Sequence, residues 1–296
     1  MSFKVLSTGL QALFQDRGRF GFASSGVSSS GVFDRAAAAR ANYAVGNLAD
    51  ATVIEVLLGG FELEALHPAT VIFCGAQSLI KVKSLNGPDK DALSNTIIDL
   101  EAGDRIFLNI PDRGMRSYLA VRGGFKVEKV LGSASSDLLS HIGPAPLQAG
   151  DELHIAQDVQ PKPWWPTLRH LPLRWPLQKT NTLEVVPGPR ADWFSAASQN
   201  SFYSTVFEVS QDSNRIGIRL NSANPLERVQ TGELKSEGMV RGSIQVPPGG
   251  HPVIFGADHP VTGGYPVIAV LTAQSSNLAA QLAPGDKIRF SKVTPE

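Results

Sequence analysis

The fold is decided by a short stretch, Leu100-x-x-Gly103-Asp104-x-Ile106, that returns twice along the chain. Its echoes are Leu147-x-x-Gly150-Asp151-x-Leu153 and Leu282-x-x-Gly285-Asp286-x-Ile288. Glycine supplies the positive φ of a tight turn, aspartate can bond back to the turn backbone, and the apolar residues that follow begin a strand. The three stretches therefore predict equivalent corners of repeated β-barrel-like units, in which the aspartates have a structural role.

The composition around these turns favours a mostly β architecture. The chain has 296 residues, of which 28 are glycine and 20 are proline, a content typical of many turns and short strands. Apolar runs of strand length recur, for example at 52–58, 105–110 and 267–272. Helices are expected at 34–45, where Asp34 can cap an alanine-rich run, and at 276–282.

The chain is expected to divide into two lobes with few short helices. Five prolines and three tryptophans lie between Asp158 and Asn181. They predict a connector at 161–180 that packs against both lobes instead of moving freely. The expected lobes are an N-terminal β-barrel at 1–160, which holds the alanine-rich helix, and a C-terminal β-barrel at 181–296.

Charge and cysteine content exclude several classes of protein. Lys plus Arg number 27 and Asp plus Glu number 27, so neither a nucleic-acid partner nor an anionic membrane partner is expected. The single cysteine, Cys74, lies in an apolar run and is interpreted as buried filler in a protein of a reducing compartment. We find no signal peptide and no apolar run that could span a bilayer, and we expect a cytoplasmic location.

Common catalytic motifs are absent from the sequence. No phosphate-binding P-loop, strand-linked GxGxxG, HExxH or GxSxG occurs. The six histidines lack metal-ligand spacing, so no metal site within the chain is predicted. Of the six, only His259 lies within a cluster of other polar residues.

Four polar clusters remain, each of which could also be a salt-bridged turn with no function. The first runs from Gln15 to Gly21 and on to Asn42, and its glycines would let backbone N–H groups approach a ligand near the start of the expected helix. The second covers 113–124. The third covers 213–220, where Arg215 and Arg219 are expected on one strand face as an open fork for an anion. The fourth joins Gln245 to 257–266.

Taken in order, these clusters carry a family resemblance that spans nearly the whole chain. Its strongest motifs are Gln15-Asp16-x-Gly18-Arg19-x-Gly21, Ser30-Gly31-x-x-Asp34, Tyr118-Leu119-Ala120-Val121-x-Gly123-Gly124, Leu131-Gly132-Ser133, Ser213-Asn214-Arg215-x-Gly217-x-Arg219, Gly242-Ser243-Ile244-Gln245-Val246-Pro247 and Thr262-Gly263-Gly264-Tyr265-Pro266. They closely resemble the allophanate hydrolase subunit 2 family, also called the biotin-dependent carboxyltransferase family or the family of the 5-oxoprolinase C-type component. The chain departs from it at Asp258-His259-Pro260-Val261, where many relatives read Asp-Arg-Gln-Thr.

The resemblance implies a cyclophilin-like β-barrel architecture in two lobes. It also implies a subunit of an ATP-dependent complex that opens 5-oxoproline to glutamate, with ATP and Mg²⁺ used in the complex and no intrinsic biotin. The implied partners are a subunit-B-type protein, similar to allophanate hydrolase subunit 1, and a subunit-A-type protein. Two alternatives stay open: a regulatory binding protein that antagonises a kinase-inhibitor partner, and a carboxyltransferase or allophanate hydrolase-type component.

The substrates shared by such proteins are lactams or ureido compounds with a small N–C=O unit. Such a unit calls for an acceptor for its N–H and for donors to its carbonyl oxygen. The expected catalytic residues are Asp16, Arg215, Arg219, Gln245 and Asp258. If ATP phosphorylates the lactam oxygen, Asp258 is the candidate ligand for the accompanying Mg²⁺ ion. Asp258 is also expected to share one cavity with Gln15, Asp16 and Arg215. The expected substrate-binding residues are Gln15, Arg19, Asp34, Asn42, Arg116, Tyr118, Asn214, His259, Thr262, Gly263, Gly264 and Tyr265.

Overall fold

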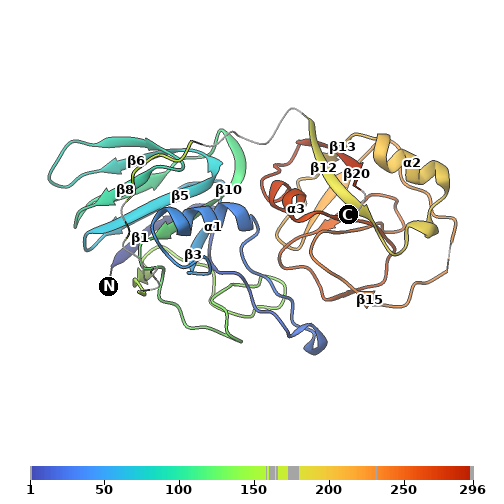
Figure 1. Cartoon of the computed structure of the whole chain (residues 1–296), viewed down its shortest axis with the longest axis horizontal. Helices are drawn as coiled ribbons and strands as arrows, with labels where there is room; N and C mark the ends of the chain where they lie inside the picture. Colours follow the sequence, from blue (N-terminus) through green and yellow to red (C-terminus); the bar gives the residue numbers. More distant parts are fainter. Residues whose placement is uncertain are drawn as a thin grey trace. The chain divides into compact units, whose positions relative to one another are not determined.

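The structure, a computed structural model, describes residues 2–157, 159, 164, 166–172, 180–230 and 232–293. The chain forms two compact units (Figure 1). Unit 1 comprises Met1–Arg19, Asp34–Ser136 and His141–Trp175, and unit 2 comprises Phe20–Phe33, Asp137–Ser140 and Pro176–Glu296. Two segments from the first half of the chain thus pack with the C-terminal half. Much of the expected connector at 161–180 lies outside the described residues.

Unit 1 is built from two β-sheets. The six-stranded sheet has the order β11 (Glu152–Leu153), β1 (Phe3–Thr8), β4 (Phe61–Ala65), β9 (Arg105–Leu108), β6 (Leu79–Lys83) and β7 (Lys90–Leu93). The five-stranded sheet has the order β2 (Gln11–Gln15), β3 (Val53–Leu57), β10 (Arg113–Val121), β5 (Ala69–Gln77) and β8 (Ile97–Leu100). Buried residues alternate along β4, so one face of that strand points into the core. Side chains of both sheets form this core.

Helix α1 (Arg35–Ala44) packs on β5 and β10 of the five-stranded sheet (Figure 1). The Asp34 side chain accepts a hydrogen bond from the Ala37 N–H, which caps the first turn. Ala37, Ala38, Ala41 and Ala44 are buried against the sheet, and their small side chains allow a close approach. The helix expected at 34–45 is confirmed.

Unit 2 contains a closed seven-stranded barrel. Its order is β12 (Thr180–Pro187), β19 (Val267–Leu271), β16 (Ser243–Gln245), β17 (Val253–Phe255), β14 (Gly217–Asn221), β13 (Phe207–Val209) and β20 (Lys287–Lys292). Strands β12 and β20 pair in parallel and close the barrel. Beside it, β15 (Glu237–Gly238) and β18 (Thr262–Gly263) form a two-stranded sheet. The prediction of a mostly β fold is confirmed.

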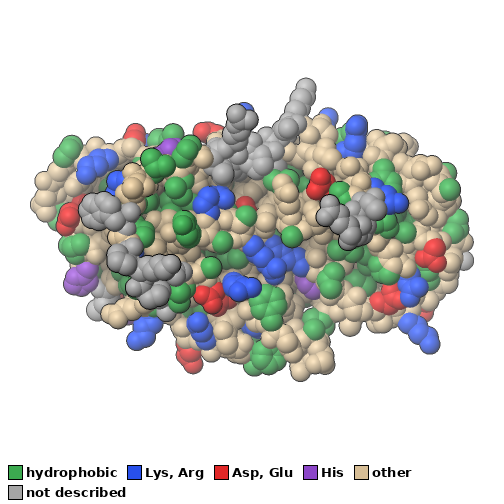
Figure 2. Space-filling model, viewed as in Figure 1, with side chains coloured by type: hydrophobic (Ala, Val, Ile, Leu, Met, Phe, Trp, Pro, Cys, Tyr) green, Lys and Arg blue, Asp and Glu red, His purple; other side chains and the backbone are tan. Residues whose placement is uncertain are grey.

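Two further helices lie in unit 2. Helix α3 (Ala273–Ala279) begins after Thr272, three residues earlier than expected, because the Thr272 hydroxyl caps it. Helix α2 (Ala196–Ser204) was not anticipated, since its serine-rich and asparagine-containing sequence has weak helix propensity. Within the described residues, no helix is long and apolar enough to cross a membrane. Acidic and basic side chains both appear on the face in Figure 2.

The three Gly-Asp stretches fold into the same turn. In each, the aspartate carboxylate accepts from the backbone N–H three residues earlier, at 3.0 Å for Asp104 and 2.8 Å for Asp151 and Asp286. The glycine has a φ of 90° at Gly103, 97° at Gly150 and 88° at Gly285. Each turn also exchanges two backbone hydrogen bonds with one strand residue; these residues are Ala65, Val5 and Val209. The structural interpretation of these aspartates therefore agrees with the geometry.

Of the three turns, the one at Asp104 has the most hydrogen bonds to its carboxylate. Its carboxylate also accepts from the Leu85 N–H and the Ser84 hydroxyl, both at 3.0 Å. Burial alone would raise the pKa of Asp104, but these hydrogen bonds and the one from Glu101 outweigh burial and hold the pKa below its ordinary value.

We predict that Asp104→Asn lowers the free energy of unfolding by about 1–3 kcal/mol at neutral pH, because the amide leaves N–H donors unpaired. Because the folded pKa is depressed, this difference from the wild type should shrink as pH falls below about 4. Urea denaturation measures both effects. Asp151→Asn is the matched control and should lower the free energy of unfolding by less. The Asp151 carboxylate accepts one hydrogen bond, from the Gln148 N–H, in a more exposed turn. Equal losses for the two variants would contradict the prediction.

Candidate functional site

In unit 2, a buried carboxylate draws together three distant segments. Asp258 is 0% exposed and forms a bidentate ion pair with Arg215, at 2.8 Å from Nε and 2.9 Å from Nη2. Its oxygens also accept from the Ser30 hydroxyl at 2.6 Å and from the Leu138 N–H at 3.1 Å. Arg215 further donates to the Gly31 carbonyl at 2.8 Å. We call these five residues the Asp258 cluster.

The electrostatics of the Asp258 cluster favour the ionised carboxylate. Burial by itself would raise the pKa of Asp258, but the Arg215 charge and the hydrogen bonds from Arg215, Ser30 and Leu138 outweigh burial. The pKa therefore lies below its ordinary value. Asp258 is a permanent anion within the fold at neutral pH.

The expected open fork of Arg215 and Arg219 is wrong. Arg215 is 2% exposed and its guanidinium is turned into unit 2, whereas Arg219 is exposed on β14. The cause is the Asn214 side chain, whose Oδ1 accepts from the N–H groups of Ile216 and Gly217 and forms a tight turn before the strand. The turn breaks the alternation that would have put both arginines on one face.

The structure also disagrees with a Mg²⁺ ion on Asp258. Both carboxylate oxygens already accept two hydrogen bonds each, and the side chain is out of contact with solvent. Within the described ranges, no group of three His, Cys, Asp or Glu side chains could hold a metal ion. These residues therefore do not fit a Mg²⁺ site, and Arg215 is not available for a phosphate.

Unit 1 contains a second saturated carboxylate. Asp16 accepts from the hydroxyls of Ser133 and Ser135 at 2.5 and 2.7 Å, and from the N–H groups of Gly18 and Ala134 at 2.8 and 2.7 Å. The side chain is buried. We call Asp16 and these four donors the Asp16 cluster. Its geometry is that of a support for the 133–135 loop.

The neighbours of Asp16 in the first polar cluster are also buried supports. Gln15 donates to the Ser136 carbonyl at 2.8 Å, and Arg19 donates to the Ser135 carbonyl. Gly143 comes so close to this loop that a Cβ atom there would lie 2.1 Å from the Ser135 oxygen. Each of these contacts fixes backbone within unit 1.

Asp34 and Asn42, both expected to bind substrate, have structural partners at the two ends of α1. Asp34 caps the helix, and its N–H donates to the Tyr118 hydroxyl at 2.6 Å. Asn42 donates to the Ala51 carbonyl at 2.8 Å and accepts from Asn47 at 3.0 Å. These contacts fix α1 and the loop that follows it.

Arg116 and Tyr118 lie on β10 beneath α1 and are buried. Arg116 forms an ion pair with Glu55 of β3, at 3.6 Å between Nε and Oε1. Burial raises the pKa of Tyr118 well above its ordinary value, and the nearby charges of Glu55 and Asp34 raise it further. Burial likewise raises the pKa of Cys74, on the neighbouring strand, to about 12, so its thiol stays protonated. Unit 1 therefore buries an ion pair, a tyrosine and a cysteine on neighbouring strands of its five-stranded sheet.

The residues of the fourth polar cluster gather around the Gly263 turn of unit 2. Gln245 on β16 donates from Nε2 to the Tyr265 carbonyl at 3.0 Å. A Cβ atom on Gly263 would lie 2.7 Å from Gln245 Nε2 and 3.1 Å from Met239 Cε, so a methyl group there would shift the end of one of these side chains. Thr262, Gly264 and Tyr265 are exposed beside it. We call Gln245, Met239 and residues 262–265 the Gly263 site.

His259 follows the Asp258 cluster directly in the chain and precedes the Gly263 site. Its ring stacks on Phe255 of β17, and its Nδ1 atom lies 2.8 Å from the Pro260 carbonyl oxygen. Burial lowers the pKa of His259 below its ordinary value, so the ring is neutral at pH 7.

Some structurally important residues were missed by sequence reasoning. Ser135, two residues after the Ser133 of the family motif, donates to Asp16, and Arg241 donates to the carbonyls of Val32 and Phe33 within unit 2. The polar run 133–137 and the Arg241-Gly242 pair were signals that could have indicated them. The structure brings Asp258, Arg215 and His259 together in unit 2. The expectation that this group shares a cavity with Gln15 and Asp16 stays a prediction.

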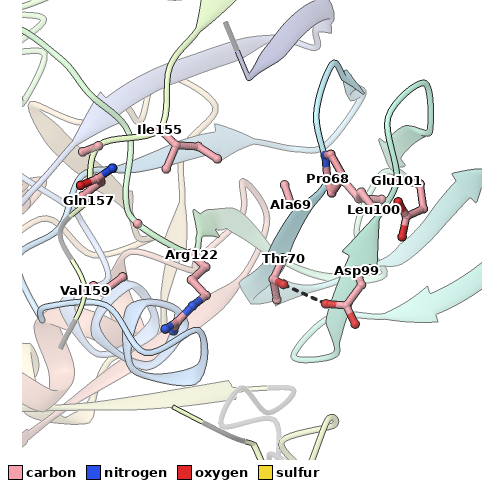
Figure 3. A pocket seen from close by; sticks show the side chains of 12 residues that line it. Pro68, Ala69, Thr70, Asp99, Leu100, Glu101, Arg122, Ile155, Gln157 and Val159 are labelled. Atoms are coloured by element: carbon pink, nitrogen blue, oxygen red, sulfur yellow. Dashed lines mark hydrogen bonds between the residues drawn. The ribbon is translucent and has the colours of Figure 1, made fainter. Parts of the chain in front are cut away.

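None of the expected site residues lines the surface hollow of unit 1 shown in Figure 3. It has a volume of about 560 Å³ and is lined by the start of β5, the end of β8, Arg122 and residues 155–157. Three of its polar side chains have partners: Thr70 donates to Asp99 at 2.8 Å, Asp99 pairs with Arg169 at 2.6 Å, and Arg122 donates to the Val45 carbonyl at 2.9 Å.

We predict that Arg215→Ala lowers the free energy of unfolding by about 3–5 kcal/mol, because Asp258 would remain buried without its cation. Arg219→Ala is the control and should change it by less than about 0.5 kcal/mol, since Arg219 is exposed. Chemical denaturation of both variants measures the difference. A loss below about 1 kcal/mol for Arg215→Ala would mean that the pair does not support the fold.

Comparison with known proteins places this geometry in a family. The chain is 34% identical over 296 residues to the C-type component of 5-oxoprolinase from Escherichia coli, and the match covers 99% of this chain and 92% of that protein. It is 31% identical to the same component from Haemophilus influenzae, with 98% and 91% covered. The crystal structure of the K. lactis urea amidolyase superposes with a TM-score of 0.89 at 26% identity, covering 99% of this chain and 19% of that one. Residues 25–292 match the pattern of a known domain, and the chain belongs to the family described as carboxyltransferase domain, subdomain A and B.

Proposed function

We propose that this chain is the C-type component of an ATP-dependent 5-oxoprolinase-type complex, which opens the cyclic amide of 5-oxoproline to give glutamate. It acts with a subunit-B-type partner and a subunit-A-type protein. The observation that carries the proposal is the match to the C-type component of the Escherichia coli 5-oxoprolinase, over 92% of that protein's length at 34% identity. The regulatory alternative has no comparable support.

The Gly263 site suits the small N–C=O unit of such a substrate. Gln245 offers an amide, which can both donate and accept hydrogen bonds. Backbone at 262–264 lies at the surface of the turn, and the exposed Tyr265 ring has the Arg228 guanidinium 5.7 Å from its centroid. An amide, backbone polar groups and an aromatic ring are groups that orient the planar amide of such a substrate.

ATP and Mg²⁺ are proposed to bind elsewhere in the complex. Asp258 and Arg215 were the candidates in this chain for binding Mg²⁺ and phosphate. They are already paired with each other in the Asp258 cluster. The contribution of this chain is therefore to bind and orient the amide and to move protons.

A second candidate function is that of a urea-carboxylase-like component. It is favoured by the TM-score of 0.88 to the Kluyveromyces lactis urea carboxylase, of which this chain covers 27%. Both candidates act on a small N–C=O unit, so the same site would serve either.

The proposal predicts that the isolated chain shows no 5-oxoproline-dependent ATP hydrolysis and that activity appears when the subunit-B-type and subunit-A-type partners are added. Coupled assays of phosphate and glutamate release measure this. Turnover by the single chain would contradict the division of roles. A complete complex that acts on urea but not on 5-oxoproline would favour the second candidate.

Within the active complex, we predict that Gly263→Ala lowers kcat/KM at least about tenfold, because its methyl group would displace Gln245 or Met239. Gly249→Ala, in an exposed turn of unit 2 outside the Gly263 site, is the matched control. A Cβ atom there would meet only the His251 Cδ2 atom, at an ordinary 3.9 Å, so its activity should stay near that of the wild type. Equal activities of the two variants would show that the Gly263 site does not position substrate.

A further inference from the structure

We propose that His259 is a catalytic residue that carries a proton on its Nε2 atom, from the water that attacks the substrate carbonyl to the amide nitrogen that leaves. This inference deepens the proposed function and rests on it, because it requires a small amide bound beside the Gly263 site.

Two contacts fix the imidazole ring. The ring planes of His259 and Phe255 differ by 9° with their centroids 6.0 Å apart, which sets the orientation of the ring. Nδ1 lies 2.8 Å from the Pro260 carbonyl oxygen. A carbonyl oxygen only accepts hydrogen bonds, so Nδ1 carries the proton and donates it. The neutral ring therefore has its lone pair on Nε2.

The Nε2 atom is available to a ligand. Within the part of the chain that the structure describes, it has no hydrogen-bond partner, and it is not among the buried polar atoms left without one. The residue as a whole is only 5% exposed. A nearly buried imidazole with one nitrogen anchored and the other open is the arrangement that a general base requires.

The charged groups around His259 are Arg241, Asp258 and Asp137. Burial lowers the pKa of His259 and Arg241 lowers it further, while the Pro260 hydrogen bond and the two carboxylates act in the opposite direction without reversing the net effect. Asp258 accepts four hydrogen bonds already, and Asp137 accepts from Ser28, Leu139 and Ser140. Both carboxylates are thus occupied by other donors.

The proton balance of the amide-opening step is closed, and it is separate from ATP hydrolysis elsewhere in the complex, which consumes a second water and releases phosphate. The water oxygen forms a bond to the carbonyl carbon while one O–H bond of the water breaks and its proton moves to Nε2. The C–N bond of the amide then breaks with its electron pair going to nitrogen, and the Nε2 proton moves to that nitrogen. His259 returns to its neutral form, so one imidazole serves as base and then as acid.

The first test reads the tautomer in the chain itself and does not depend on activity. Long-range ¹⁵N–¹H NMR spectra of the full chain at pH 7, assigned with His259→Asn, should show a protonated Nδ1 and an unprotonated Nε2 for His259. A protonated Nε2 would overturn the inference.

The second test uses the assembled complex. His259→Asn retains a donor near the position of Nδ1 and so can keep the Pro260 contact, but it has no counterpart of Nε2. We expect kcat to fall by about 10²–10⁴-fold. The pH profile of kcat/KM in the wild type should show an acidic limb below the ordinary histidine range, and His259→Asn should lose that limb.

The control is His251→Asn, at an exposed histidine of unit 2, which should keep the wild-type rate and profile. Urea denaturation checks that His259→Asn is folded. A folded His259→Asn complex with the wild-type rate and acidic limb would overturn the inference. Absence of 5-oxoproline turnover by the wild-type complex would instead contradict the proposed function, and the tautomer measurement would then decide the inference on His259.

Discussion

The buried ion pair between Asp258 and Arg215 is the constraint on which the proposed site in unit 2 depends. Ser30 and Leu138 reach it from 228 and 120 residues away in sequence, and both donate to the same carboxylate. An ion pair of this kind loses much of its Coulombic gain to desolvation, so its benefit is a unique geometry more than net stability. Because His259 is the next residue, the pair also sets the point from which the imidazole projects.

Unit 1 uses the same device. Asp16 accepts hydrogen bonds from Ser133 and Ser135, 117 and 119 residues away in sequence. In each unit, one buried aspartate accepts four hydrogen bonds from loops that are distant in sequence. Its oxygens therefore have little capacity left to accept a hydrogen bond from a ligand. The two aspartates that look most catalytic in the sequence therefore serve as supports. The proposed chemistry uses neutral groups instead: the Gln245 amide, the turn at Gly263 and the His259 imidazole.

The features that sequence predicted well are local. The Gly-Asp turns at Gly103, Gly150 and Gly285 and the helix capped by Asp34 depend on residues within a few positions of one another, so their sequence patterns suffice. The direction of Arg215 could not be predicted in this way. A two-residue alternation put it beside Arg219, and only the Asn214 turn, together with a carboxylate 43 residues further on, reverses it. Saturation of a carboxylate by distant donors has no signature in a linear pattern.

The measurement that tests the central role of the ion pair most directly is a double-mutant cycle with Arg215→Gln, Asp258→Asn and the double variant. Free energies of unfolding from urea denaturation give the coupling energy between the two side chains. A pair that organises unit 2 should show a coupling of about 1–3 kcal/mol, with the double variant more stable than the sum of the single losses predicts. Additive losses, within about 0.5 kcal/mol, would show that Asp258 and Arg215 act independently and would contradict the role assigned to the pair.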